Sequence, residues 1–340
     1  MTQIDPERLD RARRKGIWIS VLGILLVVGA GTALQRSGVG NFREIWEKAD
    51  GGLLLASWLL VSLAFLFMAL RWRSLMPRGH TPPAGELSAL ICAGLLLNYA
   101  APGPLGEVGA AWFAHRRHKV PMADALASGV AARLVGLISA AIAGFFVWLL
   151  ADLPVPEDFS PAVNTAAFIA ALLGFGLAAL VMMPNLWNRL YGALSAALPR
   201  NTYTAPVIDR GGEALASLTD AISRVTRRGT GAYAWAVLWS LCAHGAVIGG
   251  ILLAAESLAA PYSLSGVVFT YTVTTAGAVL LFALPGSYVG WDALFFGLMV
   301  SSAGIPVQES AAIAAIIRVQ QLGYMLLGGL SLGWLLRMDD

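Results

Sequence analysis

The sequence predicts an all-α polytopic membrane protein, from its composition, the lengths of its apolar runs and the placement of its basic residues. Of its 340 residues 57% are hydrophobic and 13% are charged, and the mean hydropathy is +0.70. A soluble domain carries about 25% charged residues. This composition therefore excludes a soluble globular protein, a disordered chain and a nucleic-acid-binding protein.

Six apolar runs are long enough to cross a bilayer, which takes about 20 mostly apolar residues in a helix. They occupy residues 16–34, 53–70, 122–150, 162–183, 233–256 and 308–336. The first run follows a basic stretch, but no small-residue cleavage pattern comes after it. We therefore interpret it as an uncleaved span and not as a signal peptide.

Two further apolar regions, 86–114 and 265–303, are each interrupted near the middle by a Pro-Gly pair. The pairs are Pro102-Gly103 and Pro285-Gly286. Proline removes a backbone donor and glycine loosens the chain. Each region is therefore expected to form a re-entrant hairpin of two short helices joined at a bend, which gives six full spans and two hairpins in all.

The basic residues are distributed unevenly between the two sides of this topology. Eighteen of the 23 Lys and Arg residues fall on one side and three on the other. The positive-inside rule then places both termini in the cytoplasm. With this orientation the first hairpin enters the membrane from the cytoplasm, and the second enters it from the outer side.

The chain, treated as one membrane domain over residues 1–340, contains two similar units, 86–150 and 265–336. Each unit has a bent hairpin that carries an acid, followed by a span with an arginine near its middle, and the acid-to-arginine spacing is 26 residues in both. The units have opposite orientations. This is the pattern of an inverted-topology repeat, whose broken helices line a midplane site in secondary transporters.

The acid and arginine are Glu107 and Arg133 in the first unit, and Asp292 and Arg318 in the second. A charge near the centre of a membrane helix costs roughly 2.5–3.5 kcal/mol on insertion scales. Each arginine is therefore expected to face the acid of its own unit or a wet cavity. One interpretation is structural, in which each pair only pins a hairpin to a span. The other is a substrate site.

An arginine matches a phosphate well, because it stays charged and presents a planar fork of donors. The N-termini of the half-helices after the bends would add positive dipole ends. The predicted substrate-binding residues are Asn98, Gly103, Gly106, Glu107, Arg133, Gly286, Asp292 and Arg318. The predicted candidates for proton coupling are Glu107, His244 and Asp292. No metal site and no cofactor are expected.

Residues 184–232 are predicted to form a cytoplasmic loop with amphipathic helices. Apolar residues recur at helical spacing from Leu186 to Leu198, and again from Leu215 to Val225. Such stripes are typical of helices that lie on a membrane surface. A docking surface for a partner protein is left open as an alternative.

Several motifs resemble the lysylphosphatidylglycerol synthase transmembrane, or flippase-like, family over roughly residues 10–338. They are NYAAPGPLGE at 98–107, Arg133 in the following helix, PGSYVGWDA at 285–293, the later IIRVQQLGYMLLGGL, and Arg71-Trp72. The resemblance implies a membrane domain that moves lipids across a bilayer. The aminoacyl-transferase domain of the bifunctional members is not expected here.

The chain departs from the family pattern by carrying fewer charges around these motifs. Uncharged residues stand at positions where the family has charged ones, as at Pro104, Gly109, Ala132 and Trp291. The resemblance therefore implies a lipid other than lysylphosphatidylglycerol, with a more apolar character.

The function predicted from these features is a lipid translocase of the bacterial cytoplasmic (inner) membrane. It would move an anionic or phosphate-bearing lipid through a midplane cavity lined by arginine and acidic residues. One alternative is a non-catalytic subunit that scaffolds a lipid-synthesis enzyme. Another is a membrane-embedded lipid-modifying enzyme, but acid/base or metal constellations of the kind such enzymes need are not found, and we expect no enzyme.

Overall fold

The computed structural model describes residues 47–79, 81–100, 105–197, 204–227, 229–281 and 287–337. These residues form helices and connecting segments, with no β-strand among them. The predicted span 16–34 lies outside the described residues. So do both Pro-Gly pairs, and with them the predicted site residues Gly103 and Gly286.

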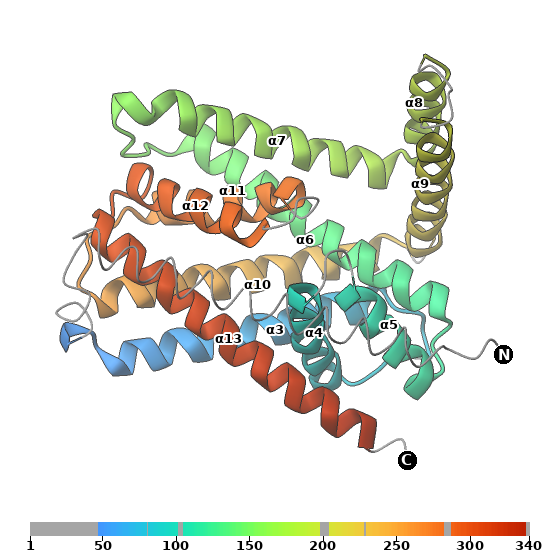
Figure 1. Cartoon of the computed structure of the whole chain (residues 1–340), viewed down its shortest axis with the longest axis horizontal. Coiled ribbons are helices and arrows are strands. Elements are labelled where there is room, and N and C mark those ends of the chain that lie inside the picture. The colour runs from blue at the N-terminus through green and yellow to red at the C-terminus, as the bar shows by residue number, and fades with distance from the viewer. Residues whose placement is uncertain are drawn as a thin grey trace.

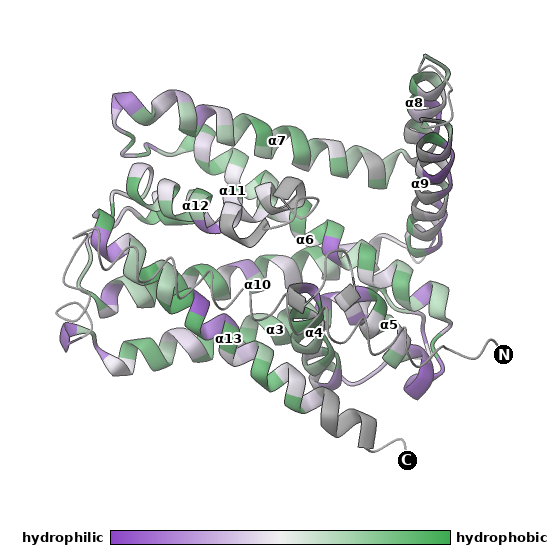
Figure 2. Cartoon of the chain, viewed as in Figure 1, coloured by the Kyte–Doolittle hydropathy of each residue, from purple (hydrophilic) through white to green (hydrophobic). Residues whose placement is uncertain are grey.

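Five helices in the described part are long and apolar enough to cross a membrane. They are α3 (Gly51–Leu75), α6 (Met122–Leu150), α7 (Ser160–Met182), α10 (Thr230–Ser257) and α13 (Val307–Arg337). Their bounds agree with the predicted spans to within three residues, except that α3 ends at Leu75, five residues after the predicted end at 70. The chain is therefore an all-α multi-pass membrane protein, as predicted. Figure 2 shows hydrophobic residues along these helices.

Local chemistry explains where these helices begin. The Asp50 carboxylate accepts hydrogen bonds from the backbone N–H groups of Gly52 and Leu53, at 2.7 and 3.1 Å, and so caps the start of α3. Gly229 precedes α10 with a φ of 94°, a left-handed conformation that favours glycine. Along the spans, large apolar side chains such as Leu59, Phe168 and Leu326 remain exposed, as suits helices that face lipid.

The two broken regions each form a pair of packed short helices. The first hairpin consists of α4 (Ala84–Ala100) and α5 (Leu105–His118), and the second of α11 (Leu264–Leu281) and α12 (Ser287–Ser301). In the first hairpin the backbones come very close at two glycines. A Cβ added at Gly106 would lie 2.2 Å from the carbonyl oxygen of Gly94, so no larger residue fits there without moving the backbone.

The hairpins open toward opposite ends of the molecule (Figure 1). Val120, which joins α5 to α6, packs in one cluster with Met76 after α3 and with Ala236 near the start of α10. We call this side the basic end, because Arg78, Arg117 and Arg227 lie there. The first hairpin enters and leaves at the basic end.

The second hairpin enters and leaves at the other end of the molecule. There, the Asp50 backbone N–H before α3 donates to the carbonyl of Ser257, the last residue of α10, at 2.9 Å. The helix α11 begins seven residues after Ser257. The two units therefore have inverted orientations within the chain, whereas the assignment of the basic end to the cytoplasm stays a prediction.

Each hairpin packs on the arginine-bearing helix of the other unit, because α4 lies against α13 and α11 lies against α6. Glycines bring the helices close. A Cβ at Gly328 of α13 would lie 2.3 Å from the backbone carbon of Cys92 in α4, and one at Gly144 of α6 would lie 2.8 Å from Oγ1 of Thr272 in α11. The helices α3 and α10 pack along each other between the two units.

The predicted loop helices are α8 (Pro184–Ala197) and α9 (Thr204–Thr226), which run across the ends of the spans (Figure 1). In α8 the apolar stripe of Leu186, Leu190 and Leu194 is exposed, as an interfacial helix requires. In α9, by contrast, Ile222 and Val225 are buried. This part of the α9 stripe is covered by the protein itself and not by lipid.

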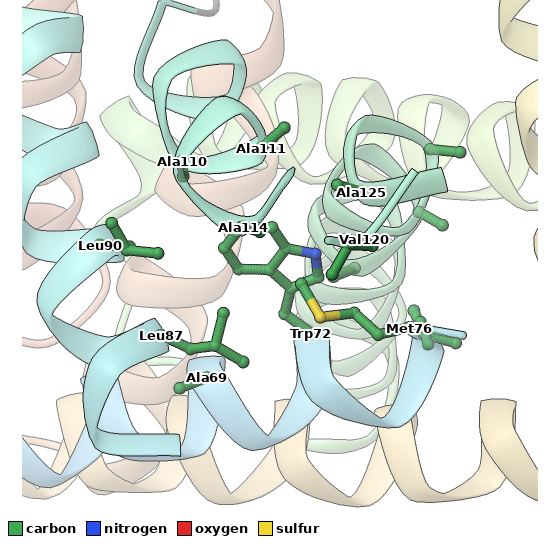
Figure 3. Close-up of a cluster of buried hydrophobic side chains, with 14 of the residues drawn as sticks. Ala69, Trp72, Met76, Leu87, Leu90, Ala110, Ala111, Ala114, Val120 and Ala125 are labelled. Carbon is green, nitrogen blue, oxygen red and sulfur yellow. The ribbon is translucent and has the colours of Figure 1, made fainter. Parts of the chain in front are cut away.

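A buried cluster fixes the base of the first unit to α3 (Figure 3). Trp72 lies at its centre, with Leu87 and Leu90 from α4 and Ala111 from α5 around the ring. The indole N–H of Trp72 donates to Oγ of Ser128 in α6 at 3.1 Å. The end of α3 is therefore enclosed by the hairpin and by α6 and does not project into solvent.

Candidate functional site

The first ion pair joins the first turn of α5 to the middle of α6. Nη1 of Arg133 donates to Oε1 of Glu107 in a short charge-assisted hydrogen bond. Asn98, in the last turn of α4, orients the acid: its Nδ2 donates to Oε2 of Glu107 at 3.3 Å, and its Oδ1 accepts from the backbone N–H of Gly106 at 2.7 Å. Asn98 thus satisfies one of the backbone donors at the start of α5, which have no partner within the helix.

The second ion pair has the same plan with different neighbours. Nε of Arg318 donates to both carboxylate oxygens of Asp292, at 2.7 and 3.0 Å. Nη1 of Arg318 donates to Oε1 of Gln321, one turn further along α13. The guanidinium also lies over the Trp291 ring, 5.1 Å from its centroid, a cation–π contact.

The two pairs differ in which partner is more exposed. In the first pair the side chain of Arg133 is 34% exposed and that of Glu107 19%. In the second pair Arg318 is 16% exposed and Asp292 38%. In each pair, therefore, about a third of one charged side chain is exposed, while its partner is more buried.

His244, predicted as a proton carrier, lies in a separate cluster between α6, α10 and α11. It is 8% exposed. Its Nε2 lies 2.9 Å from the carbonyl oxygen of Gly136, and its Nδ1 lies 3.0 Å from the Tyr271 hydroxyl. These contacts suit a neutral imidazole whose Nε2–H donates to the carbonyl and whose Nδ1 accepts from the phenol. A part in proton coupling stays a prediction.

The structure thus groups the predicted site residues into two sets. Asn98, Gly106, Glu107 and Arg133 form the first set, and Asp292 and Arg318 form the second. Among the described residues, no group of three or more His, Cys, Asp or Glu side chains could hold a metal ion. A cavity shared by the two pairs stays a prediction.

Sequence analysis did not include Arg71 among the site residues. Its guanidinium reaches from α3 toward α6 and α10, and its Nη1 donates to Oγ of Ser240 at 3.3 Å. Arg71 lies four residues before the end of α3, where an arginine usually belongs to the adjoining loop. One sequence feature could have predicted its inward position. Arg71 precedes Trp72, whose buried side chain places this turn of α3 inside the protein.

A family model described as "Lysylphosphatidylglycerol synthase TM region" matches residues 17–329. The chain belongs to this family. No curated protein and no solved structure matches the chain. Membership in the lysylphosphatidylglycerol synthase TM region family confirms the resemblance seen in the motifs, and it indicates a membrane protein of lipid metabolism or transport.

Proposed function

We propose that this member of the lysylphosphatidylglycerol synthase TM region family is a lipid translocase. It moves an anionic or phosphate-bearing lipid across the bacterial cytoplasmic membrane, with the basic end and both termini in the cytoplasm. The two bent hairpins act as gates, and the two ion pairs contact the headgroup.

One observation carries the proposal. Two units of opposite orientation each fix an arginine of a long span to an acid near the start of the hairpin's second helix. Charged groups inside a membrane protein are costly, and they usually mark the path of a substrate or an ion. Inverted units with broken helices are the architecture in which transporters place such paths.

The chemistry of each pair suits a phosphate. A guanidinium binds a carboxylate and a phosphate with the same fork of N–H donors. An entering headgroup can therefore replace the carboxylate as the arginine's acceptor. The displaced acid of each unit, Glu107 or Asp292, is then the group that accepts a proton or returns to the arginine when the lipid leaves. His244 completes the set of proposed proton carriers.

The test is lipid translocation by purified protein in vesicles, followed with labelled lipids and a membrane-impermeant quencher. Single substitutions would leave a charge unpaired and risk misfolding. The informative variants neutralise whole pairs, Arg133→Gln with Glu107→Gln and Arg318→Gln with Asp292→Asn. Each double variant is expected to lower the rate for an anionic lipid about tenfold or more, which is the size of a lost charged hydrogen bond.

Arg189→Gln is the matched control, because Arg189 is exposed on α8 and belongs to neither pair. It should translocate lipid at the parent rate. If both double variants also keep the parent rate, the roles given to the pairs are wrong. If the parent protein moves no lipid faster than empty vesicles, the translocase proposal itself fails.

A second function has one observation in its favour. The exposed leucine stripe of α8 (Leu186, Leu190 and Leu194) fits a partner protein as well as a membrane surface. A non-catalytic subunit of this kind would co-purify with one stoichiometric lipid-synthesis enzyme, and it would move no lipid alone. The proposal gives the chain no catalytic step, so turnover of a lipid by the purified protein would contradict it.

A further inference from the structure

Arg71 is a cation that the ion pairs do not explain. It extends from α3 into the protein, where Nη1 has the Ser240 hydroxyl as its partner, and Nε is buried with no hydrogen-bond partner. In the part of the chain that the structure describes, no carboxylate lies within ion-pair distance of its guanidinium. A charge that is drawn into the protein without a counter-ion is costly, so its retention calls for an anion from outside the described residues.

The guanidinium of Arg71 lies directly against the backbone of α6. A Cβ added at Gly136 would lie 2.2 Å from Nη1 of Arg71 and 2.9 Å from its Cζ. The guanidinium of Arg71 therefore occupies space that is free only because residue 136 is a glycine. Because Arg133 precedes Gly136 by three residues, it lies on the same face of α6, one turn away.

The two arginines and the acid between the hairpin and α6 make a site with an excess of positive charge. Arg71 and Arg133 contribute two cations, and Glu107 contributes one carboxylate. The neighbouring polar groups are the Ser240 hydroxyl and the His244 imidazole, which contacts the carbonyl of Gly136 and is neutral in the arrangement described above. A group with one or two negative charges and several acceptor oxygens fits this arrangement, and a phosphate has both properties.

The surface beside Arg71 carries the same sign of charge. An open cleft of about 710 Å³ lies at the basic end, between the end of α3 and the start of α10. Its lining residues include Arg78, Arg227 and Trp235 but no acid. Ser74 lines the cleft, and its hydroxyl donates to the Arg71 carbonyl at 2.7 Å, so the cleft begins one helical turn from Arg71.

We propose that Arg71 binds the phosphate of an anionic lipid headgroup next to the Arg133–Glu107 pair, which the headgroup reaches from the cleft at the basic end. This inference rests on the proposed function and names the residue that selects for a phosphate. It also makes the two units unequal, since the phosphate subsite belongs to the first unit.

The experiment measures how much a lipid raises the thermal unfolding midpoint of the purified full chain in neutral detergent. The probes are dihexanoyl phosphatidate, dihexanoyl phosphatidylcholine and inorganic phosphate. The variants are Arg71→Gln, Arg71→Lys and the control Arg73→Gln, whose arginine is exposed two residues away. Lipid translocation in vesicles is measured for the same four proteins.

The parent and Arg73→Gln are expected to be stabilised by phosphatidate more than by phosphatidylcholine. Arg71→Gln should bind phosphatidate about tenfold more weakly, and Arg71→Lys should retain part of the affinity because it keeps the charge. Without lipid, Arg71→Gln should unfold at the parent temperature or higher, because a costly unpaired charge is gone.

Two results would overturn the inference. In one, Arg71→Gln retains the full phosphatidate effect. In the other, it unfolds at a lower temperature with and without lipid by the same amount, as a purely structural arginine would. An equal effect of inorganic phosphate would overturn the assignment to a lipid headgroup.

The translocation assay separates this inference from the proposed function. If Arg71→Gln keeps both binding and the parent rate, the inference fails and the translocase stands. If the parent moves no lipid but Arg71→Gln loses phosphatidate binding, the subsite stands and the translocase fails.

Discussion

In the first unit the residue one turn after the central arginine is Gly136, and the guanidinium of Arg71 fills the space beside it. In the second unit the corresponding residue is Gln321, which accepts a hydrogen bond from Arg318 itself. Residues 230–317 contain no Lys or Arg at all. The same acid-to-arginine spacing therefore gives a positively charged site in one unit and a neutral one in the other. The repeated arrangement of helices therefore does not make the two units equal in charge.

The largest expected difference between the units comes from removing each acid. Glu107→Gln leaves Arg133 without its carboxylate, one helical turn from Arg71, which has none, so it should lower the free energy of unfolding by roughly 3 kcal/mol. Asp292→Asn leaves only Arg318 without a carboxylate, and Gln321 and Trp291 still contact that arginine. The expected loss in the free energy of unfolding is therefore smaller, roughly 1.5 kcal/mol. Thermal unfolding in detergent compares the two variants. Equal losses would contradict the claim that the units differ in charge.

The next effect concerns the packing within each hairpin. Gly106→Ala places a Cβ against the backbone of Gly94, which cannot move alone, and should lower stability by about 2 kcal/mol. The matched variant in the second hairpin is Gly277→Ala, whose nearest atom is the side-chain Cδ2 of Leu294 at 3.2 Å. That side chain can rotate away, so the loss should be under about 1 kcal/mol. A larger loss at Gly277 would contradict this description.

The aromatic neighbours of the arginines give a smaller effect. Trp291→Leu removes the ring under Arg318 and should cost about 1 kcal/mol, because the contact is partly shielded from water. Its control is Trp112→Leu in the first unit, where Arg116 lies 5.3 Å from an exposed ring. The Trp112–Arg116 pair is solvated, so Trp112→Leu should lower the free energy of unfolding by less than half as much as Trp291→Leu. The midpoint of chemical unfolding checks both values.

The bases of the hairpins are held by different forces. In the first hairpin Glu86 pairs with Nε of Arg117 at 3.3 Å and with Nε2 of His118 at 2.9 Å. In the second, the Ser263 N–H donates to the Ala303 carbonyl at 2.8 Å. Glu86→Gln should cost about 0.5 kcal/mol, and high salt should reproduce part of that loss. Hydrogen exchange at the start of α4 should rise with salt, while exchange at the start of α11 should not.

The smallest effect is a titration beside the second hairpin. The Tyr262 hydroxyl donates to Oε1 of Glu256 at 2.6 Å, and this hydrogen bond to a carboxylate raises the pKa of Tyr262 above its usual value. A raised pKa adds stability that is complete below about pH 10 and is lost as the pH rises through the pKa of the folded state. The difference in ultraviolet titration between the parent and Tyr262→Phe should show this phenol ionising above free tyrosine.

The spans and both ion pairs could be predicted because each follows from a simple physical need. A helix that crosses a bilayer needs about 20 apolar residues, and an arginine at mid-span needs a nearby acid. The equal spacing from Glu107 to Arg133 and from Asp292 to Arg318 made the partners identifiable. The structure places both pairs as expected.

The part of the site that depends on packing between distant segments could not be predicted. Arg71 lies near a helix end, where a loop arginine is the usual interpretation, and it is drawn inside only because α4, α5 and α6 enclose Trp72. The stripe on α9 shows which face is apolar but not what covers it. Ile222 and Val225 turned out to be covered by neighbouring helices.

The crossed packing of the hairpins has a consequence for how the chain is assembled. The surface on which α4 settles is supplied by α13, and the surface for α11 is supplied by α6. If the polypeptide were divided between α9 and α10, each fragment would contain one hairpin, and the helix against which that hairpin packs would belong to the other fragment. Neither fragment would fold fully alone, but two co-expressed fragments could assemble into the complete fold. Because α13 is synthesised long after α4, the first hairpin cannot complete its packing until α13 has left the ribosome.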